Sequence, residues 1–341
     1  MLPARLAFSL LSPAGSRARL SVLIFHRVLP QPDPIFPGEV CAASFDAILG
    51  WLGQCCNVIP LDEAVKRLRQ GNLPARAAAI TFDDGYADNH GVALPILQRH
   101  GMAATFFIAT GFLDGGRMWN DSVIESVRRC AHRTLDLSDV ALPGAGDSRF
   151  DITSPEQQRQ AIGAIIGRIK YAPMADRVAL SEAVAQRAAV QLPTDLMLST
   201  AQVRALRKAG MQIGAHTQHH PILARLDAVA ARDEIARSKI ALETMLGERV
   251  GLFAYPNGAP GTDYGADAVS AVRELGFDAA VSTSSGSADR HSDVFQLPRF
   301  TPWDRTRGRF CGRLAANLCR PGQTVKHSVT HAVTPTAAAG M

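Results

Sequence analysis

The sequence predicts an α/β protein in which short parallel strands alternate with amphipathic helices. Short apolar runs alternate along most of the chain with segments whose apolar residues recur at helical spacing. The chain has 341 residues, of which 47% are hydrophobic, so it can bury a large core. The polar clusters that could carry chemistry follow apolar runs, as expected at the carboxyl ends of parallel strands.

The first half of the chain shows this alternation clearly. Residues 20–25 form a continuous apolar run, which predicts a buried strand. Phe45, Ile48 and Leu52 recur at helical spacing and predict a helix over residues 44–52. The elements expected next are, in order, a strand over 58–60, a helix over 61–69, a strand over 77–82, a helix over 93–100 that Gly101 ends, and a strand over 104–108.

The second half repeats the same rhythm. The elements expected there are a helix over 200–209 that Gly210 stops, a strand over 211–214, a helix over 229–246, a strand over 250–255, a helix over 266–275 and a strand over 278–282. This order is typical of a parallel sheet, because each helix forms the crossover between two strands.

Between residues 115 and 198 the alternation breaks. Residues 119–130 show a helical pattern, residues 134–150 form a polar connection, and residues 155–190 are rich in Ala, Arg, Glu and Gln, which favours helix. We therefore expect a helical insertion, which is either a packed excursion or a lid over the functional site.

These patterns divide the chain into an N-terminal segment over 1–19, a main domain over 20–310 that contains the insertion, and a tail over 320–341. The tail lacks hydrophobic periodicity, and we expect it to be disordered.

Composition bounds the classes of function. The net charge is +5, from 36 basic and 31 acidic residues spread along the chain, and no pattern of a nucleic-acid module is present. The six cysteines show no metal-ligand spacing, so buried thiols in a reducing cytoplasm are the simplest interpretation. The N-terminal apolar stretch is short for a signal peptide, and no segment is long enough to span a bilayer. A membrane-surface helix at the N-terminus stays open as an alternative.

Two polar motifs carry the chemistry. Asp83 and Asp84 follow the predicted strand 77–82, and Gly85 permits the turn through which both carboxylates can share one site. His216 and His220 are four residues apart, a spacing that we expect to place both on one side of a helical turn. One carboxylate and two imidazoles can hold a hydrolytic metal ion, and a second carboxylate can take a proton from water. Taken singly, each motif could be a polar turn or surface histidines.

The two motifs and the Phe-Ala-Tyr-Pro-Asn-Gly segment over residues 253–258 occur in the order T-F-D-D-G, H-[ST]-x-x-H-P and P-x-G. This pattern resembles the polysaccharide deacetylases, the carbohydrate esterase family that includes the chitooligosaccharide N-deacetylases of nodulation and peptidoglycan deacetylases. The layout is most similar to the poly-N-acetylglucosamine deacetylase branch, since His26 ends an apolar run near the N-terminus. The resemblance implies a distorted (β/α) barrel with fewer strands than the eight-stranded form.

The resemblance also implies a role for each residue of the first two motifs. Asp84, His216 and His220 match the metal ligands, and Asp83 matches the general base. His219 is a rival ligand by proximity. The ligand types favour Zn²⁺, and such a site also accepts Co²⁺, Ni²⁺ or Fe²⁺.

Other predicted site residues come from the remaining blocks. The backbone N–H of Asn257 matches the donor that holds the oxyanion, and His26 is the candidate general acid, with a core histidine as the alternative. The arginine that usually precedes the third block and steadies the base is absent, and Arg299 is its candidate substitute. Arg299, Tyr255 and Trp119 are also predicted on the substrate side of the site.

The resemblance implies a hydrolase that removes acetyl groups from N-acetylated amino sugars of a glycan and releases acetate. One alternative substrate is a small or lipid-linked amino sugar, or an O-acetyl ester. An alternative of another class is an inactive carbohydrate-binding protein on the same scaffold. The expected partner is therefore an N-acetylated glycan or amino sugar and not a nucleic acid.

Overall fold

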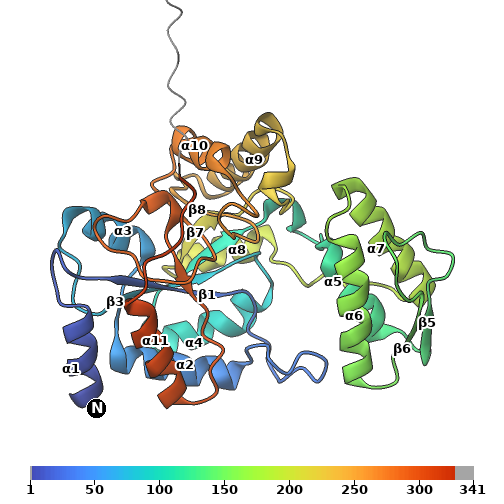
Figure 1. Cartoon of the computed structure of the whole chain (residues 1–341), viewed down its shortest axis with the longest axis horizontal. Coiled ribbons are helices and arrows are strands. Elements are labelled where there is room, and N and C mark those ends of the chain that lie inside the picture. Colours follow the sequence, from blue (N-terminus) through green and yellow to red (C-terminus); the bar gives the residue numbers. More distant parts are fainter. Residues whose placement is uncertain (1, 327–341) are drawn as a thin grey trace, which may run out of the picture.

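The computed structural model describes residues 2–326, with side chains from residue 5 onward, and has a central sheet surrounded by helices (Figure 1). The strand order is β10-β1-β3-β4-β7-β8-β9, β2 pairs with β3, and these pairs are all parallel. The strands are β1 (Leu20–Phe25), β2 (Asn57–Val58), β3 (Ala77–Phe82), β4 (Thr105–Ile108), β7 (Gln212–Ala215), β8 (Leu252–Ala254), β9 (Ala279–Val281) and β10 (Arg299–Phe300).

The sheet nearly closes into a barrel, because β9 lies alongside the segment that leads into β10. Val281 and Leu297 form a parallel bridge there. The Ser282 N–H donates to the Leu297 carbonyl at 2.8 Å, and the Leu297 N–H donates to the Ala280 carbonyl at 2.9 Å. The predicted α/β class and distorted (β/α) barrel are confirmed.

The side chains of the strands pack in two apolar clusters, since successive side chains point to opposite faces. Leu23 and Phe25 of β1 pack in the larger cluster, which includes side chains of α2, α4 and α8 to α11. Leu20 and Val22 belong to the second cluster, which includes the apolar face of α3. The helices around the sheet are α2 (Ala42–Cys55), α3 (Leu61–Gln70), α4 (Leu94–Arg99), α8 (Thr200–Lys208), α9 (Ala228–Leu246), α10 (Ala266–Glu274) and α11 (Arg307–Leu318).

The segment predicted as an insertion stands to one side of the barrel in Figure 1. It contains α5 (Trp119–Arg129), α6 (Pro155–Ile169) and α7 (Met174–Ala188), and its apolar cluster also includes Ile35 from the loop after β1. The polar connection expected over residues 134–150 also contains a two-stranded antiparallel sheet, β5 (Thr134–Asp136) with β6 (Arg149–Asp151). Each of these strands buries only its central residue, so the sequence pattern was too short to predict them.

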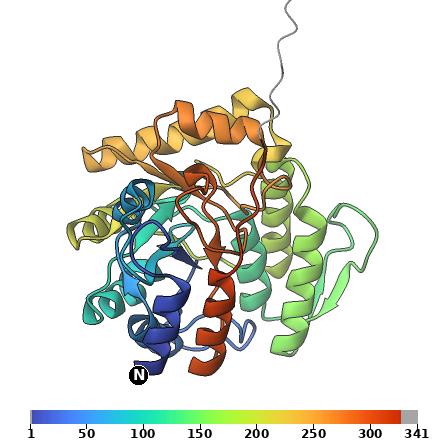
Figure 2. The same cartoon turned by 60° about the vertical axis from the view of Figure 1, so that its left-hand side comes forward.

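The structure has a helix at the N-terminus, where the sequence left a membrane-surface helix open as an alternative, and a helix near the C-terminal end, α11, that was not predicted. In α1 (Leu2–Leu11), Phe8 is 3% exposed and packs in the larger apolar cluster. Its neighbour α11 lies beside it (Figure 2). The apolar stripe of α11 is formed by Phe310, Leu314 and Leu318, which are separated by Arg, Gly and Ala residues that conceal the period.

The tail predicted to begin at residue 320 is hydrogen-bonded to the barrel over its first residues. The Val325 N–H donates to Gln296 Oε1 at 2.7 Å, and the Gln323 N–H donates to Ser284 Oγ at 2.6 Å. The rest of the predicted tail, residues 327–341, lies outside the described residues. No helix within residues 2–326 is both long and apolar enough to cross a membrane.

Candidate metal centre and active site

Asp83 and Asp84 leave the carboxyl end of β3 through a turn. The Asp83 N–H still donates to the Phe25 carbonyl of β1 at 2.9 Å, whereas Asp84 and Gly85 have φ angles of 75° and 89°. Asp83 is 2% exposed and Asp84 is 8% exposed. The turn therefore holds two adjacent carboxylates in a buried place at the end of the barrel, as the sequence predicts.

The structure brings Asp84, His216 and His220 together, with one potential ligand atom from each within 4.8 Å of the others. Asp84 Oδ1 lies 3.4 Å from the Nε2 atoms of both histidines. This oxygen is buried, and nothing among the described residues donates a hydrogen bond to it. Because a buried carboxylate oxygen needs a positive partner, this donor set fits a divalent cation.

Hydrogen bonds and burial prepare the two imidazoles as ligands. The Nδ1 of His216 lies 2.8 Å from the Ala254 carbonyl, to which it would donate, leaving Nε2 free for a metal. Burial lowers the pKa of His220 to about 4, so this ring is neutral at neutral pH. Burial alone would raise the pKa of Asp84, but the neighbouring imidazoles of His216 and His220 lower it.

The two histidines lie on a loop and not on the helical turn expected from their spacing. Thr217 and His220 have φ angles of 62° and 52°, which a helix does not allow. The Thr217 hydroxyl accepts the His220 N–H at 3.1 Å and fixes this loop. His219 lies outside the cluster, because its Nδ1 pairs with Glu234 at 2.8 Å.

Arg299 binds Asp83 with both ends of its guanidinium. Nη1 donates to Oδ1 and Nη2 donates to Oδ2, each at 2.7 Å, and Nε donates to the Ser282 carbonyl at 2.7 Å. Burial alone would raise the pKa of Asp83, but the charge of Arg299 outweighs it and lowers this pKa. Arg299 is 1% exposed, so it positions Asp83 and does not reach substrate.

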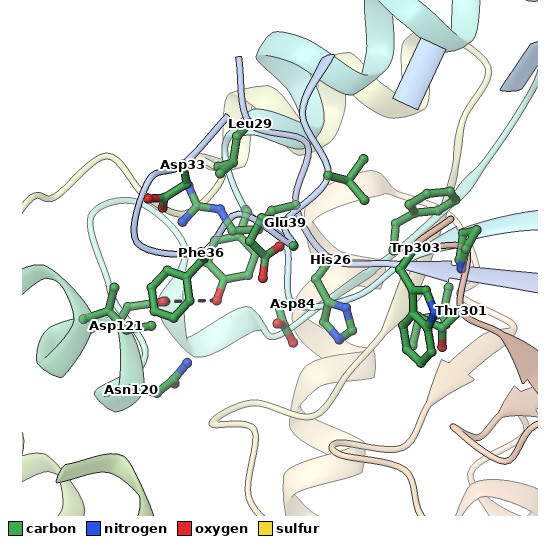
Figure 3. Close-up of a pocket in the computed structure, with 18 of the residues that line it drawn as sticks. His26, Leu29, Asp33, Phe36, Glu39, Asp84, Asn120, Asp121, Thr301 and Trp303 are labelled. Atoms are coloured by element: carbon green, nitrogen blue, oxygen red, sulfur yellow. Dashed lines mark hydrogen bonds between the residues drawn. The ribbon is translucent and has the colours of Figure 1, made fainter. Parts of the chain in front are cut away.

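A cavity of about 410 Å³ opens beside Asp84, one of the three grouped residues. His26 is exposed at the end of β1 and lines this cavity together with Asp84, so it is not a core histidine. Figure 3 shows its ring beside the Asp84 carboxylate, with Trp303 on the other side. The cavity thus has a titratable nitrogen close to the predicted metal residues.

Two of the residues predicted on the substrate side lie elsewhere. Tyr255 is fully buried, stacks on Tyr264 and donates its hydroxyl to the Phe295 carbonyl at 3.0 Å, so its side chain belongs to the core. Trp119 is absent from the cavity lining, packs in the insertion and lies under the Arg177 guanidinium. Asn257 is exposed with a φ of 57°, and nothing among the described residues accepts its N–H.

Sequence reasoning missed several residues that line the cavity. Trp303 is 62% exposed and follows β10, so an aromatic residue just beyond a strand end was its available signal. Asp121 of α5 is 3% exposed and accepts the Tyr86 hydroxyl at 3.2 Å (Figure 3). Burial, opposed by Arg27 and reinforced by Asp84, raises the pKa of Asp121 to about 7.

Comparison with known proteins gives a consistent result. The sequence profile of a family described as polysaccharide deacetylase matches residues 70–139 and 152–280. YxkH of Bacillus subtilis (strain 168), a candidate polysaccharide deacetylase, is 22% identical over 284 residues, which are 83% of this chain and 71% of YxkH.

Solved structures share the fold. The Streptococcus pyogenes deacetylase PplD, solved with acetate, has a TM-score of 0.58 at 18% identity and covers 89% of this chain and 99% of its own. IcaB from Ammonifex degensii has a TM-score of 0.55 at 18% identity and covers 90% of this chain and 98% of its own.

Proposed function

The chain belongs to the polysaccharide deacetylase family of hydrolases, and from this premise we propose that it is a metal-dependent enzyme that removes the acetyl group from an N-acetylated amino sugar of a glycan. One observation carries the proposal: Asp84, His216 and His220 converge from two distant segments beside an open cavity, and the buried Asp84 Oδ1 has no hydrogen-bond donor among the described residues. A protein that only binds a glycan at its surface would not need a buried carboxylate grouped with two imidazoles.

Asp84, His216 and His220 would hold the cation, with Zn²⁺ as first choice and Co²⁺, Ni²⁺ or Fe²⁺ as alternatives. When bound, the cation supplies Lewis-acid activation of water and of the acetyl carbonyl. Asp83 accepts the proton of the attacking water, because Arg299 holds its carboxylate in place as an anion.

The remaining steps use groups at the cavity. The water oxygen bonds to the acetyl carbon, and the free N–H of Asn257 donates to the resulting oxyanion. The carbon–nitrogen bond then breaks as His26 gives a proton to the departing nitrogen. The products are acetate and a free amino sugar.

The alternatives differ in substrate and in activity. A small or lipid-linked amino sugar, or an O-acetyl ester, would use the same residues, since the site recognises the acetyl group. An inactive carbohydrate-binding protein is disfavoured because the Asp84, His216 and His220 side chains are all present and grouped.

Acetate release tests the proposal. Purified protein would be given chitooligosaccharides, poly-N-acetylglucosamine, peptidoglycan fragments and O-acetylated xylan, with and without chelator. We expect acetate from at least one N-acetylated substrate, loss of release with chelator, and recovery on adding Zn²⁺, Co²⁺, Ni²⁺ or Fe²⁺. Glycan binding without acetate release under every metal condition would favour the inactive binding protein instead.

A further inference from the structure

Arg177 of α7 is a buried cation without a counter-charge. The residue is only 8% exposed, and its Nε is buried with no acceptor among the described residues. Burial is the one cause that lowers its pKa, and no carboxylate raises it. Arg299, which is also buried, shows the usual arrangement, since it binds Asp83 with two hydrogen bonds.

Arg177 lines a pocket of about 350 Å³ between the insertion and the loop that follows the metal ligand His220. Lys170 and Arg225 line the same pocket, and each holds its charge 5.5 Å from the ring of Tyr171. No acidic side chain lines this pocket, and none of its three cations forms an ion pair within the described part of the chain. The pocket therefore concentrates positive charge around an aromatic ring.

We propose that this pocket binds an anionic group, a phosphate or a carboxylate, through Arg177, Lys170 and Arg225. An anion would supply the missing partner of Arg177, because a guanidinium donates to phosphate or carboxylate oxygens in parallel pairs. The exposed ring of Tyr171 offers a face on which a sugar that carries the anion can rest.

Two chain segments connect the pocket to the proposed active site. Pro221 and Ile222 line it and directly follow His220. The Arg177 guanidinium lies 5.7 Å from the ring of Trp119, and the next residue, Asn120, lines the catalytic cavity. We infer that the anion is part of the sugar substrate, a step that rests on the proposed function, whereas anion binding itself does not.

Binding is tested on the full-length, metal-loaded protein by calorimetric titration with inorganic phosphate and, separately, with glucuronate. Lys170→Gln and Arg225→Gln should each weaken binding of at least one probe by about tenfold, as expected when a charged hydrogen-bonding partner is removed. Lys66→Gln on α3, an exposed lysine far along the chain, is the matched control and should bind like wild type. The tighter probe identifies phosphate or carboxylate as the preferred anion.

Arg177→Met adds a readout that a purely structural arginine would not give. Without anion, the variant should melt at the same or a higher temperature than wild type, because an uncompensated buried charge has been removed. Phosphate or glucuronate should then raise the melting temperature of wild type but not of the variant. A variant that melts lower and still responds to the anions would overturn the proposal, as would equal affinities in Lys170→Gln, Arg225→Gln and wild type.

The inference that the anion is part of the sugar substrate is tested separately, by enzyme kinetics. The KM for a phosphorylated or uronate-bearing N-acetylated sugar should rise in Lys170→Gln and Arg225→Gln, while the KM for its neutral counterpart stays unchanged. If wild type binds the anions but releases acetate from no N-acetylated substrate under any metal condition, the proposed function fails and the anion pocket stands. If it releases acetate but binds no anion, the pocket proposal fails and the function stands.

Discussion

Arg299 and Asp83 are 216 residues apart in sequence and form a fully buried pair with two hydrogen bonds of 2.7 Å. The pairing of β10 with β1 places Arg299 there, since Val22 of β1 is its register partner. The sequence block at residues 253–258 lacks the arginine that the family resemblance leads one to expect, with Phe253 and Ala254 in its place. Barrel closure supplies the missing charge from another strand.

Arg299→Met is the first test of this pair. It would leave the Asp83 carboxylate buried without a partner, so we expect the free energy of unfolding to fall by about 3–5 kcal/mol. Urea unfolding followed by circular dichroism measures the loss. Adding Asp83→Asn to Arg299→Met should recover part of it, because the uncompensated charge is then gone. Arg232→Met, at the exposed pair with Glu274, is the control and should cost about 1 kcal/mol or less.

The second prediction concerns metal content. His216→Ala and His220→Ala should each lose bound metal and activity together. The cluster offers only three ligand atoms, so each variant would leave two. His219→Ala should retain metal, since His219 is paired with Glu234 outside the cluster. Metal per protein chain, measured by atomic emission after dialysis, would contradict the ligand assignment if either ligand variant kept a full complement.

The sequence predicted the strands best where apolar runs were long. The predicted bounds of β1 and β3 agree with the structure, since both strands are buried over their whole length. The helix α11 and the β5–β6 sheet were missed, because a few large apolar residues among small and charged ones, and single buried residues in each strand, give only a weak signal. The local sequence pattern therefore predicted the strands of the barrel better than the helix α11 and the β5–β6 sheet.

Some features of the site could likewise be predicted from the sequence, and others could not. Asp84, His216 and His220 could be grouped from motif spacing and family resemblance. The loop conformation of the histidines could not, because their spacing of four residues fits a helical turn equally well and does not reveal the positive φ angles of Thr217 and His220. Trp303 and Asp121 reach the cavity from segments that only the folded chain brings together, and the position of Trp303 just after a strand was the one local signal.

The third prediction separates the two aspartates. Asp83→Asn keeps the Asp84 carboxylate and both imidazoles, so we expect metal content near wild type. It removes the proton acceptor, and turnover should fall by about 10²–10⁴-fold. Metal analysis and acetate release on the same preparation measure both effects. Loss of metal in Asp83→Asn, with retention in Asp84→Asn, would show that the two roles are exchanged.

The fourth prediction concerns His26 as the general acid. His26→Ala should keep the fold and the metal, because the side chain is exposed to the cavity and is not among the grouped metal residues. Turnover of an N-acetyl substrate should fall, since an unprotonated amide nitrogen is a poor leaving group. An activated aryl acetate needs no such proton and should be affected much less. Equal losses on the two substrates would remove the acid role from His26.

The last prediction uses Asp121. Burial raises its pKa in the folded protein to about 7, and the charge of Asp84 adds to this rise, although Arg27 lowers the pKa. The unfolded chain releases this proton near pH 4, whereas the folded protein keeps it up to about pH 7. Stability should therefore fall as the pH rises from about 4 to about 7 and level off above, with a total cost of roughly 4 kcal/mol at most.

Asp121→Asn removes this titration while keeping an acceptor for the Tyr86 hydroxyl. The variant should match wild type near pH 4 and become progressively more stable than wild type toward pH 8. Melting temperatures across this range, in chelator-treated protein so that Asp84 keeps its full charge, measure the difference. Asp195→Asn, at an exposed position, should follow the wild-type profile. If the Asp121→Asn and wild-type profiles run parallel from pH 4 to pH 8, the pKa of Asp121 is the same in the folded and unfolded chain, which contradicts the prediction.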